Sequence, residues 1–128
     1  NNRLDISAIK NCIELEEVNL GFSNIQSISG IENLSVLTKI DLRNNNISSL
    51  KPLENLKNLE ELNLSNNTIS DTSSYIDSDG NTKTYNNLEI LANLNKTGNL
   101  KNLYLDGNDN IINWSPLSSL KWTEKTGW

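Results

Sequence analysis

The side chains of Asp77, Asp79 and Asn81 have the spacing of the first, third and fifth oxygen ligands of a helical calcium loop. That pattern also requires a glycine at its sixth position and a glutamate at its twelfth, where this chain has Thr82 and Leu88. An Asp-Gly pair between β-forming residues is instead typical of a hairpin turn. We therefore predict a hairpin here and no metal site, with calcium binding as the alternative.

Few residues of this chain could catalyse a reaction. It has no histidine, the commonest general base, and its single cysteine, Cys12, can form neither an internal disulfide nor a zinc cluster. We expect Cys12 to be a small core side chain. The carboxylates of Asp41, Glu61 and Asp106 could work as an acid and base pair only where deep burial shifts a pKa. We predict a protein that is not an enzyme and has no cofactor.

The charge balance limits the partners. Eleven Lys and Arg residues stand against sixteen Asp and Glu residues, which gives a net charge of −5. This charge argues against a polyanionic partner, so we predict no binding to nucleic acid. No segment approaches the roughly 20 apolar residues that cross a bilayer, and we expect a monomer that inserts into no membrane.

Apolar residues recur with a fixed period. The pattern Leu-x-x-Leu-x-Leu-x-x-Asn-x-Ile, with Val or Ile at some Leu positions, starts at Leu15 and returns 22 residues later at Leu37 and again at Leu59. A fourth copy starts at Leu100, after an insertion at about residues 70–88. Such a period is typical of repeat architectures.

The ends of the chain complete this organisation. Residues 1–14 match the second part of a unit, and residues 121–128 follow the last return segment. We predict one repeat domain over 1–128 with a partial N-terminal unit and a C-terminal cap at 121–128. Three tryptophans near the C-terminus could cover the exposed core of the last coil, and the alternative is that they begin another module.

The spacing within one unit predicts its local structure. Alternating apolar residues in Leu-x-Leu favour a short strand with one face inward. After the Asn, apolar residues fall three apart, as in Ile47, Leu50 and Leu53, which favours a 3₁₀ or tight-turn return over an α-helix. One coil cannot bury its own apolar face, but stacked coils bury a continuous core. We therefore predict an α/β solenoid with a parallel sheet.

This pattern resembles the leucine-rich repeat, and the 22-residue unit with its Pro-Leu-x-x-Leu returns at Pro52 and Pro116 resembles the bacterial internalin-like subclass. The resemblance covers about residues 4–121. It implies a curved stack with a short-stranded parallel sheet on the concave face and 3₁₀ or irregular returns on the convex face. It also implies a bacterial protein at the cell surface or secreted.

The repeated asparagine predicts a hydrogen-bonded ladder. A buried turn leaves backbone N-H and C=O groups that a carboxamide can satisfy in adjacent coils. Asn45, Asn67 and Asn108 occupy this position, and Ser23 replaces the asparagine in the first unit. We expect a weaker or water-bridged contact at Ser23.

The resemblance assigns binding to the outward residues of the strands. Charged, amide and aromatic side chains gather there, with Arg43 and Tyr104 of the types enriched in interface anchors. Glu17, Lys39 and Glu61 form an alternating-charge row that could pair laterally, although exposed ion pairs contribute only about 0–1 kcal/mol. The predicted ligand-binding residues are Glu17, Asn19, Lys39, Asp41, Arg43, Glu61, Asn63, Asn102, Tyr104 and Asp106.

Two functions fit these observations. The first is a non-catalytic adhesion or recognition module that binds another protein, or a glycan, through the concave face and the inserted loop. The alternative is a structural spacer that holds flanking domains of a larger surface protein apart.

Overall fold

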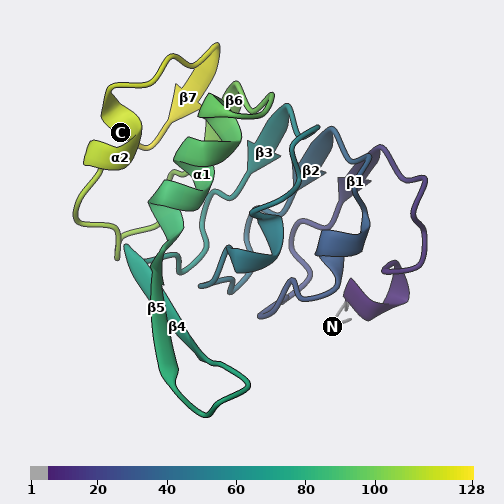
Figure 1. The fold of residues 1–128 in the computed structure, drawn as a ribbon. Helices are drawn as coiled ribbons and strands as arrows, with labels where there is room; N and C mark the ends of the chain where they lie inside the picture. Colours follow the sequence, from purple (N-terminus) through teal and green to yellow (C-terminus); the bar gives the residue numbers. More distant parts are fainter. Residues whose placement is uncertain (1–5) are drawn as a thin grey trace.

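The computed structural model describes residues 6–128 of the chain. Successive coils each add one short strand to a parallel sheet, as Figure 1 shows. The strands are paired in the order β1 (Glu17–Asn19), β2 (Lys39–Asp41), β3 (Glu61–Asn63), β6 (Asn102–Tyr104) and β7 (Glu124–Thr126). The predicted solenoid with a short-stranded parallel sheet is confirmed.

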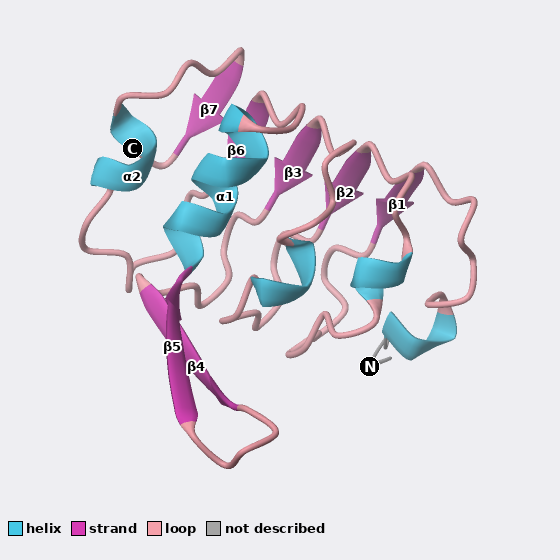
Figure 2. Cartoon of the chain, in the orientation of Figure 1, coloured by secondary structure: helices cyan, strands magenta, loops and turns pink. Residues whose placement is uncertain are grey.

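The return segments lie across the core from the sheet (Figure 2). Three of them contain the expected single 3₁₀ turns, η1 (Ile6–Ala8), η2 (Ile31–Asn33) and η3 (Lys51–Leu53). In η3, Pro52 is tolerated because the first turn of a helix needs no backbone N-H donor. A short helix, α2 (Ser115–Ser118), uses Pro116 in the same way.

One continuous core runs through the stack. Ile40, Leu62 and Leu103 lie at matching positions of adjacent strands, and each is at most 2% exposed. Burying one such side chain contributes about 1.5–3 kcal/mol relative to leaving it exposed. Each coil therefore depends on its neighbours for stability, as is usual for solenoids.

The predicted asparagine ladder is present. The Nδ2 group of Asn67 donates to the carbonyl oxygens of Leu42, in the preceding coil, and Leu64, in its own coil, both at 3.0 Å. Its Oδ1 accepts from the backbone N-H of Ile47 at 3.0 Å. The same pattern is made by Asn45 and Asn108. The carboxamides thus connect adjacent coils.

The contact at Ser23 is weaker, as expected, because its side chain bonds only within its own coil. Its hydroxyl donates to the carbonyl oxygen of Gly21 in its own coil at 3.1 Å, while its backbone N-H donates to Asn45 Oδ1 at 3.0 Å. The coil containing Ser23 is therefore held by the asparagine of the next coil rather than by its own side chain.

The return that follows β3 and the hairpin is an α-helix, α1 (Asn87–Lys96), where a 3₁₀ or tight-turn return was expected. The Asn86 side chain caps it by accepting a hydrogen bond from the N-H of Glu89 at 2.9 Å. Leu88, Leu91 and Asn95 are buried at the i, i+3 and i+7 positions of one helical face. Leu88 therefore belongs to the solenoid core and not to an exposed loop.

The segment before this helix is the predicted hairpin. Strands β4 (Thr72–Ile76) and β5 (Thr82–Asn86) are antiparallel and project from the stack (Figure 1). At the turn, Asp77 Oδ1 accepts hydrogen bonds from the backbone N-H groups of Asp79 and Asn81, each at 2.9 Å. The Asp77 carboxylate therefore organises the turn itself.

The C-terminal segment contributes both aromatic packing and a strand. The rings of Trp114 and Trp128 are stacked with centroids 5.7 Å apart, and Trp122 meets Trp128 edge-on at 5.5 Å. Strand β7 pairs with β6 and was not predicted, because Glu-Lys-Thr lacks apolar alternation. Its central residue Lys125 is exposed, with its Nζ 5.0 Å from the Trp128 ring centroid.

The prediction that Cys12 is a core side chain is wrong. The residue is exposed, although Leu34, one period later, is fully buried. Cys12 belongs to the outermost coil that the structure describes at this end, where fewer neighbours cover the return. Residues 1–5 of the predicted partial unit 1–14 lie outside the described residues. In the part of the chain that is described, no helix has the length and apolar character to cross a membrane.

Candidate functional site

The outward side chains of the sheet form rows across the strands. The register aligns Glu17 with Lys39 and Lys39 with Glu61, and this row continues to Asn102 and Glu124. Two positions further along, a second row comprises Asn19, Asp41, Asn63, Tyr104 and Thr126. Adjacent strands are about 4.8 Å apart, so side chains in one row can contact the same ligand.

The sheet face is hollowed over its first three strands. The hollow has a volume of about 370 Å³, and Val18 and Ile40 contribute to its lining. Six of the predicted residues line it as well, namely Glu17, Asn19, Lys39, Asp41, Glu61 and Asn63. The other four, Arg43, Asn102, Tyr104 and Asp106, lie outside this lining.

The charges in the hollow are not paired with one another. Lys39 lies between Glu17 and Glu61 in the row, yet none of the ion pairs among residues 6–128 involves these three side chains. The lateral pairing considered for this row is therefore absent within that part of the chain. Glu61 Oε1 accepts a hydrogen bond from Asn102 Nδ2 at 3.5 Å, so the charges of Glu17 and Lys39 and the second oxygen of Glu61 are available to a ligand.

The polar residues at the strand ends are held in fixed orientations. Asn19, Asp41 and Asn63 each accept a hydrogen bond from the backbone N-H two residues later, at 3.0, 3.2 and 3.0 Å. Asp41 also lies 3.4 Å from the Nε of Arg43. These side chains lose little further freedom on binding, which lowers the entropic cost of recognition.

Tyr104 lies on the more acidic half of the face. Partial burial, together with the negative charges of Glu61 and Glu124, raises the pKa of Tyr104 above its ordinary value of 10.0. Its hydroxyl therefore stays protonated at neutral pH and can donate. In the adjacent row, the buried Oδ1 of Asn102 has no hydrogen-bond partner among the described residues.

Phe22 is a functional candidate that the sequence analysis missed. Its backbone φ is +58°, and 70% of the residue is exposed to solvent. The equivalent positions in later coils are also left-handed, but they are occupied by Asn44, Asn66 and Gly107, which tolerate this conformation. The guanidinium Cζ of Arg43 lies 6.0 Å from the Phe22 ring centroid. Alignment of the repeats could have revealed this misplaced aromatic residue.

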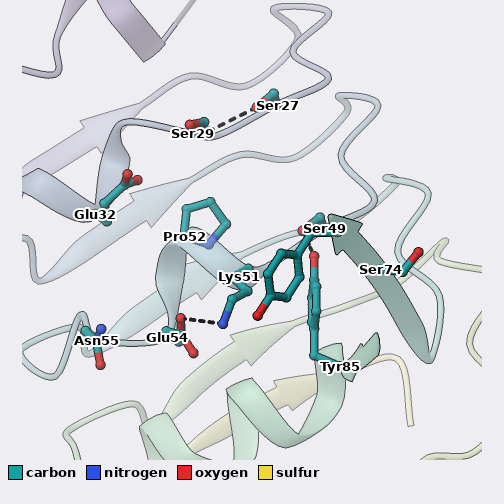
Figure 3. Close-up of a pocket in the computed structure, with 11 residues that line it drawn as sticks. Ser27, Ser29, Glu32, Ser49, Lys51, Pro52, Glu54, Asn55, Ser74 and Tyr85 are labelled. Carbon is teal, nitrogen blue, oxygen red and sulfur yellow. Dashed lines mark hydrogen bonds and ion pairs between the residues drawn. The ribbon is translucent and has the colours of Figure 1, made fainter. Parts of the chain in front are cut away.

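A second hollow lies on the return side, between the hairpin and the turns η2 and η3 (Figure 3). Its volume is about 490 Å³. Lys51 stands beside Tyr75 and Tyr85 of the hairpin, and its Nζ forms an ion pair with Glu54 at 2.8 Å. The predicted binding residues of the sheet face do not line this hollow.

Metal chemistry gains no support from the acidic side chains that the structure describes. No group of three or more His, Cys, Asp or Glu residues among them could hold an ion. In the hairpin turn, Asp77 Oδ2 lies 3.9 Å from the Nζ of Lys83. Both oxygens of Asp77 therefore have partners within the hairpin itself.

Comparison with known proteins identifies the repeat. The family described as Leucine Rich repeats (2 copies) matches residues 35–77. No curated protein matches the chain. A solved internalin, InlF of Listeria monocytogenes, superposes over 100% of this chain with a TM-score of 0.79 and 26% identity. Internalin C2 of the same species covers 95% of it with a TM-score of 0.75 and 28% identity.

A third solved structure shares the fold. The functional domain of InlJ from Listeria monocytogenes, described as including a cysteine ladder, covers 93% of the chain with a TM-score of 0.53 and 17% identity. The present chain has one cysteine and an asparagine ladder instead. It spans 33%, 46% and 26% of the lengths of these three structures, respectively. The fold is a leucine-rich repeat solenoid similar to that of the internalins.

Proposed function

We propose that this internalin-like leucine-rich repeat chain is a non-catalytic recognition module that binds another protein through its sheet face. The similarity to Listeria internalins supports a bacterial protein that is secreted or held at the cell surface. The open, polar hollow over β1, β2 and β3 supports binding rather than catalysis, because it does not enclose a substrate away from water.

The observation that carries this proposal is the conformation of Phe22. A non-glycine residue in the left-handed region costs about 1–2 kcal/mol. Asparagine or glycine stands at the equivalent positions of the other coils, whereas the first coil holds a largely exposed aromatic ring there. Strain retained on a surface is typical of ligand clamps, and an aromatic ring beside Arg43 is a typical interface anchor.

The charges of the face indicate the chemistry of the partner. Glu61, Asp106 and Glu124 make the β3, β6 and β7 side acidic, while Phe22 and Arg43 form an apolar and cationic edge near β1 and β2. We infer a partner that offers an apolar side chain to Phe22 and a basic group to the acidic side. The acidic side begins two strands from β1 and ends four strands from it, so the two contacts are separated by about 10–19 Å across the sheet.

The hairpin supplies a second accessible surface for the same module. Ile76 is 65% exposed and Tyr75 is 42% exposed on a segment that projects from the stack. Exposed apolar residues on a projecting loop are common in binding sites. We propose that the hairpin is a second contact surface for a protein partner, on the return side of the stack and separate from the sheet face.

Selection of displayed peptides on the purified chain tests this function. A library of random peptides should yield binders that combine an aromatic or aliphatic residue with Lys or Arg. Phe22→Asn should weaken their binding at least about tenfold. Ile112→Asn is the matched control, because Ile112 is an 86% exposed apolar residue outside the face.

A structural spacer is the competing function, and the same experiment separates the two. Peptides that bind Phe22→Asn as tightly as the original chain would place recognition elsewhere. A library that yields no binder would favour the spacer. In either case, the sheet face would not be the recognition surface.

A further inference from the structure

We propose that the hollow between the hairpin and the η2 and η3 turns is a binding site for a neutral saccharide. This site shares no lining residue with the hollow of the sheet face, so its test does not depend on the proposed protein-binding function. The hollow combines an aromatic wall with hydroxyl, amide and carboxylate groups (Figure 3).

The hairpin wall is fixed to the solenoid by one buried carboxamide. Asn87 is fully buried, and its Nδ2 donates to the carbonyl oxygens of Ser48 and Ser70 and to Ser73 Oγ at 2.9–3.2 Å. Its Oδ1 accepts from the N-H of Leu50 at 3.0 Å. These bonds join both sides of the hollow, so the site is formed before a ligand arrives.

The aromatic wall is made by two tyrosines. The ring centroids of Tyr75 and Tyr85 are 5.9 Å apart, and the Nζ of Lys51 lies 5.4 and 5.6 Å from them. The Tyr85 hydroxyl is hydrogen-bonded to the hydroxyl of Ser49, whereas Tyr75 remains 42% exposed. The Tyr75 ring thus offers an apolar surface against which the C-H face of a sugar ring can pack.

Other side chains of the hollow can donate and accept hydrogen bonds. The side chains of Ser29, Asn55 and Ser74 make no hydrogen bond within the described residues, and all three are exposed. Glu32 uses Oε1 to accept from the N-H of Gly30 at 2.7 Å, which leaves Oε2 for a ligand. Hydroxyl and carboxamide groups both donate and accept, as do the hydroxyls of a saccharide.

The charges argue for a neutral ligand. An anion would meet the carboxylates of Glu32 and Glu54. A cation would compete with Lys51, which already occupies the positions beside both tyrosine rings and the Glu54 carboxylate. A polyhydroxylated ligand without charge avoids both conflicts. A hollow of about 490 Å³ has the volume of an ordinary small-ligand site.

Titration of the ¹⁵N-labelled chain with sugars tests the site. The neutral probes are maltotriose, cellotriose and triacetylchitotriose, and the charged probes are sialyllactose and deacetylated chitotriose. At least one neutral probe should shift the amide signals of Ser29, Asn55 and Tyr75. The two charged probes should bind more weakly than the neutral one that binds best. The two chitotrioses differ in acetylation and thus in charge, which makes them a matched pair.

Substitutions then test whether the sugar contacts the Tyr75 ring. Tyr75→Ala should weaken saccharide binding about tenfold, whereas Tyr75→Phe, which keeps the ring, should largely restore it. Ile76→Ala is the control on the opposite face of the same strand and should leave the affinity unchanged. Phe22→Asn should also have no effect on the sugar, which separates this site from the protein-binding face.

Three outcomes would overturn the proposal. No shift with any neutral probe would remove the site. Shifts confined to Lys39 and Asp41 would place the sugar on the sheet face. Tighter binding of a charged probe would show that the ligand class is wrong.

Discussion

At the scale of single residues, the position within the repeat determines the backbone conformation and the hydrogen bonds that each residue must provide. The left-handed position after the strand is filled by Asn44, Asn66 and Gly107 in three coils, and by Phe22 in the first. The carboxamide position is filled by asparagine in three coils and by Ser23 in the first. Substitutions at the two residues that depart from the repeat, Phe22 and Ser23, should therefore show what each repeated position contributes to stability.

Phe22→Asn should stabilise the protein while it weakens binding. Asparagine tolerates the left-handed conformation, so the free energy of unfolding should rise by about 1 kcal/mol. Urea denaturation measures this change. Phe22→Leu is the control, since it keeps a side chain that is unfavourable in this conformation. An unchanged or lower stability of Phe22→Asn would show that the phenylalanine is not strained.

Asn67→Ala should destabilise the protein far more than Ser23→Ala. The first change leaves the buried backbone groups of Leu42, Leu64 and Ile47 without their side-chain partner. The expected loss is about 2–3 kcal/mol, against less than about 1 kcal/mol for the single bond of Ser23. Equal losses in urea denaturation would mean that the carboxamide does not connect the coils as described.

Tyr104 should make stability depend on pH in the alkaline range. Its pKa is raised in the folded state above its ordinary value of 10.0, so the folded protein holds the phenolic proton more tightly. This contribution is fully present below pH 10 and is lost as the pH rises through the folded pKa. Tyr104→Phe should therefore lose less stability than the original chain between pH 9 and pH 11. Parallel losses for both proteins would contradict this assignment.

At the scale of elements, the sequence predicts regular coils better than it predicts departures from them. The strands β1, β2, β3 and β6 and the hairpin follow from the period, the alternation and the Asp-Gly turn. The helix α1 was missed because Leu91 and Leu94 fit both a three-residue and a helical spacing. Strand β7 was missed because its pairing with β6 depends on tertiary contacts rather than on an apolar pattern.

The candidate sites were predictable to different degrees for the same reason. Outward strand positions follow from the period, so the residues of the sheet face were identified from the sequence. The hollow beside the hairpin depends on how Asn87 holds that segment against the return that contains η3. No local pattern contains this long-range contact.

Asn87→Ala should release the hairpin without unfolding the stack. The hairpin and the return that contains η3 would lose the buried bonds that Asn87 makes to Ser70, Ser48 and Leu50. Hydrogen exchange should become faster in β4 and β5, while the amides of β2 and β3 stay protected. Asn55→Ala provides an exposed asparagine as control. Unchanged exchange in β4 and β5 would show that Asn87 does not hold the hairpin.

At the scale of the whole molecule, the solenoid separates two surfaces that share one core. The sheet carries the hollow over β1, β2 and β3, and the return side carries the hollow beside the hairpin. Each coil depends on its neighbours for its stability, so both surfaces are held by the same stack of buried leucines and isoleucines. Changes confined to exposed side chains of one surface should leave the other unaffected.

The most direct test of the central claim is to map a bound peptide by NMR. The tightest peptide from the displayed library, added to the ¹⁵N-labelled chain, should shift the amide signals of Phe22, Arg43 and Lys39. These shifts should be absent in Phe22→Asn at the same peptide concentration. Shifts confined to the return segments, or equal shifts in both proteins, would contradict recognition through the sheet face.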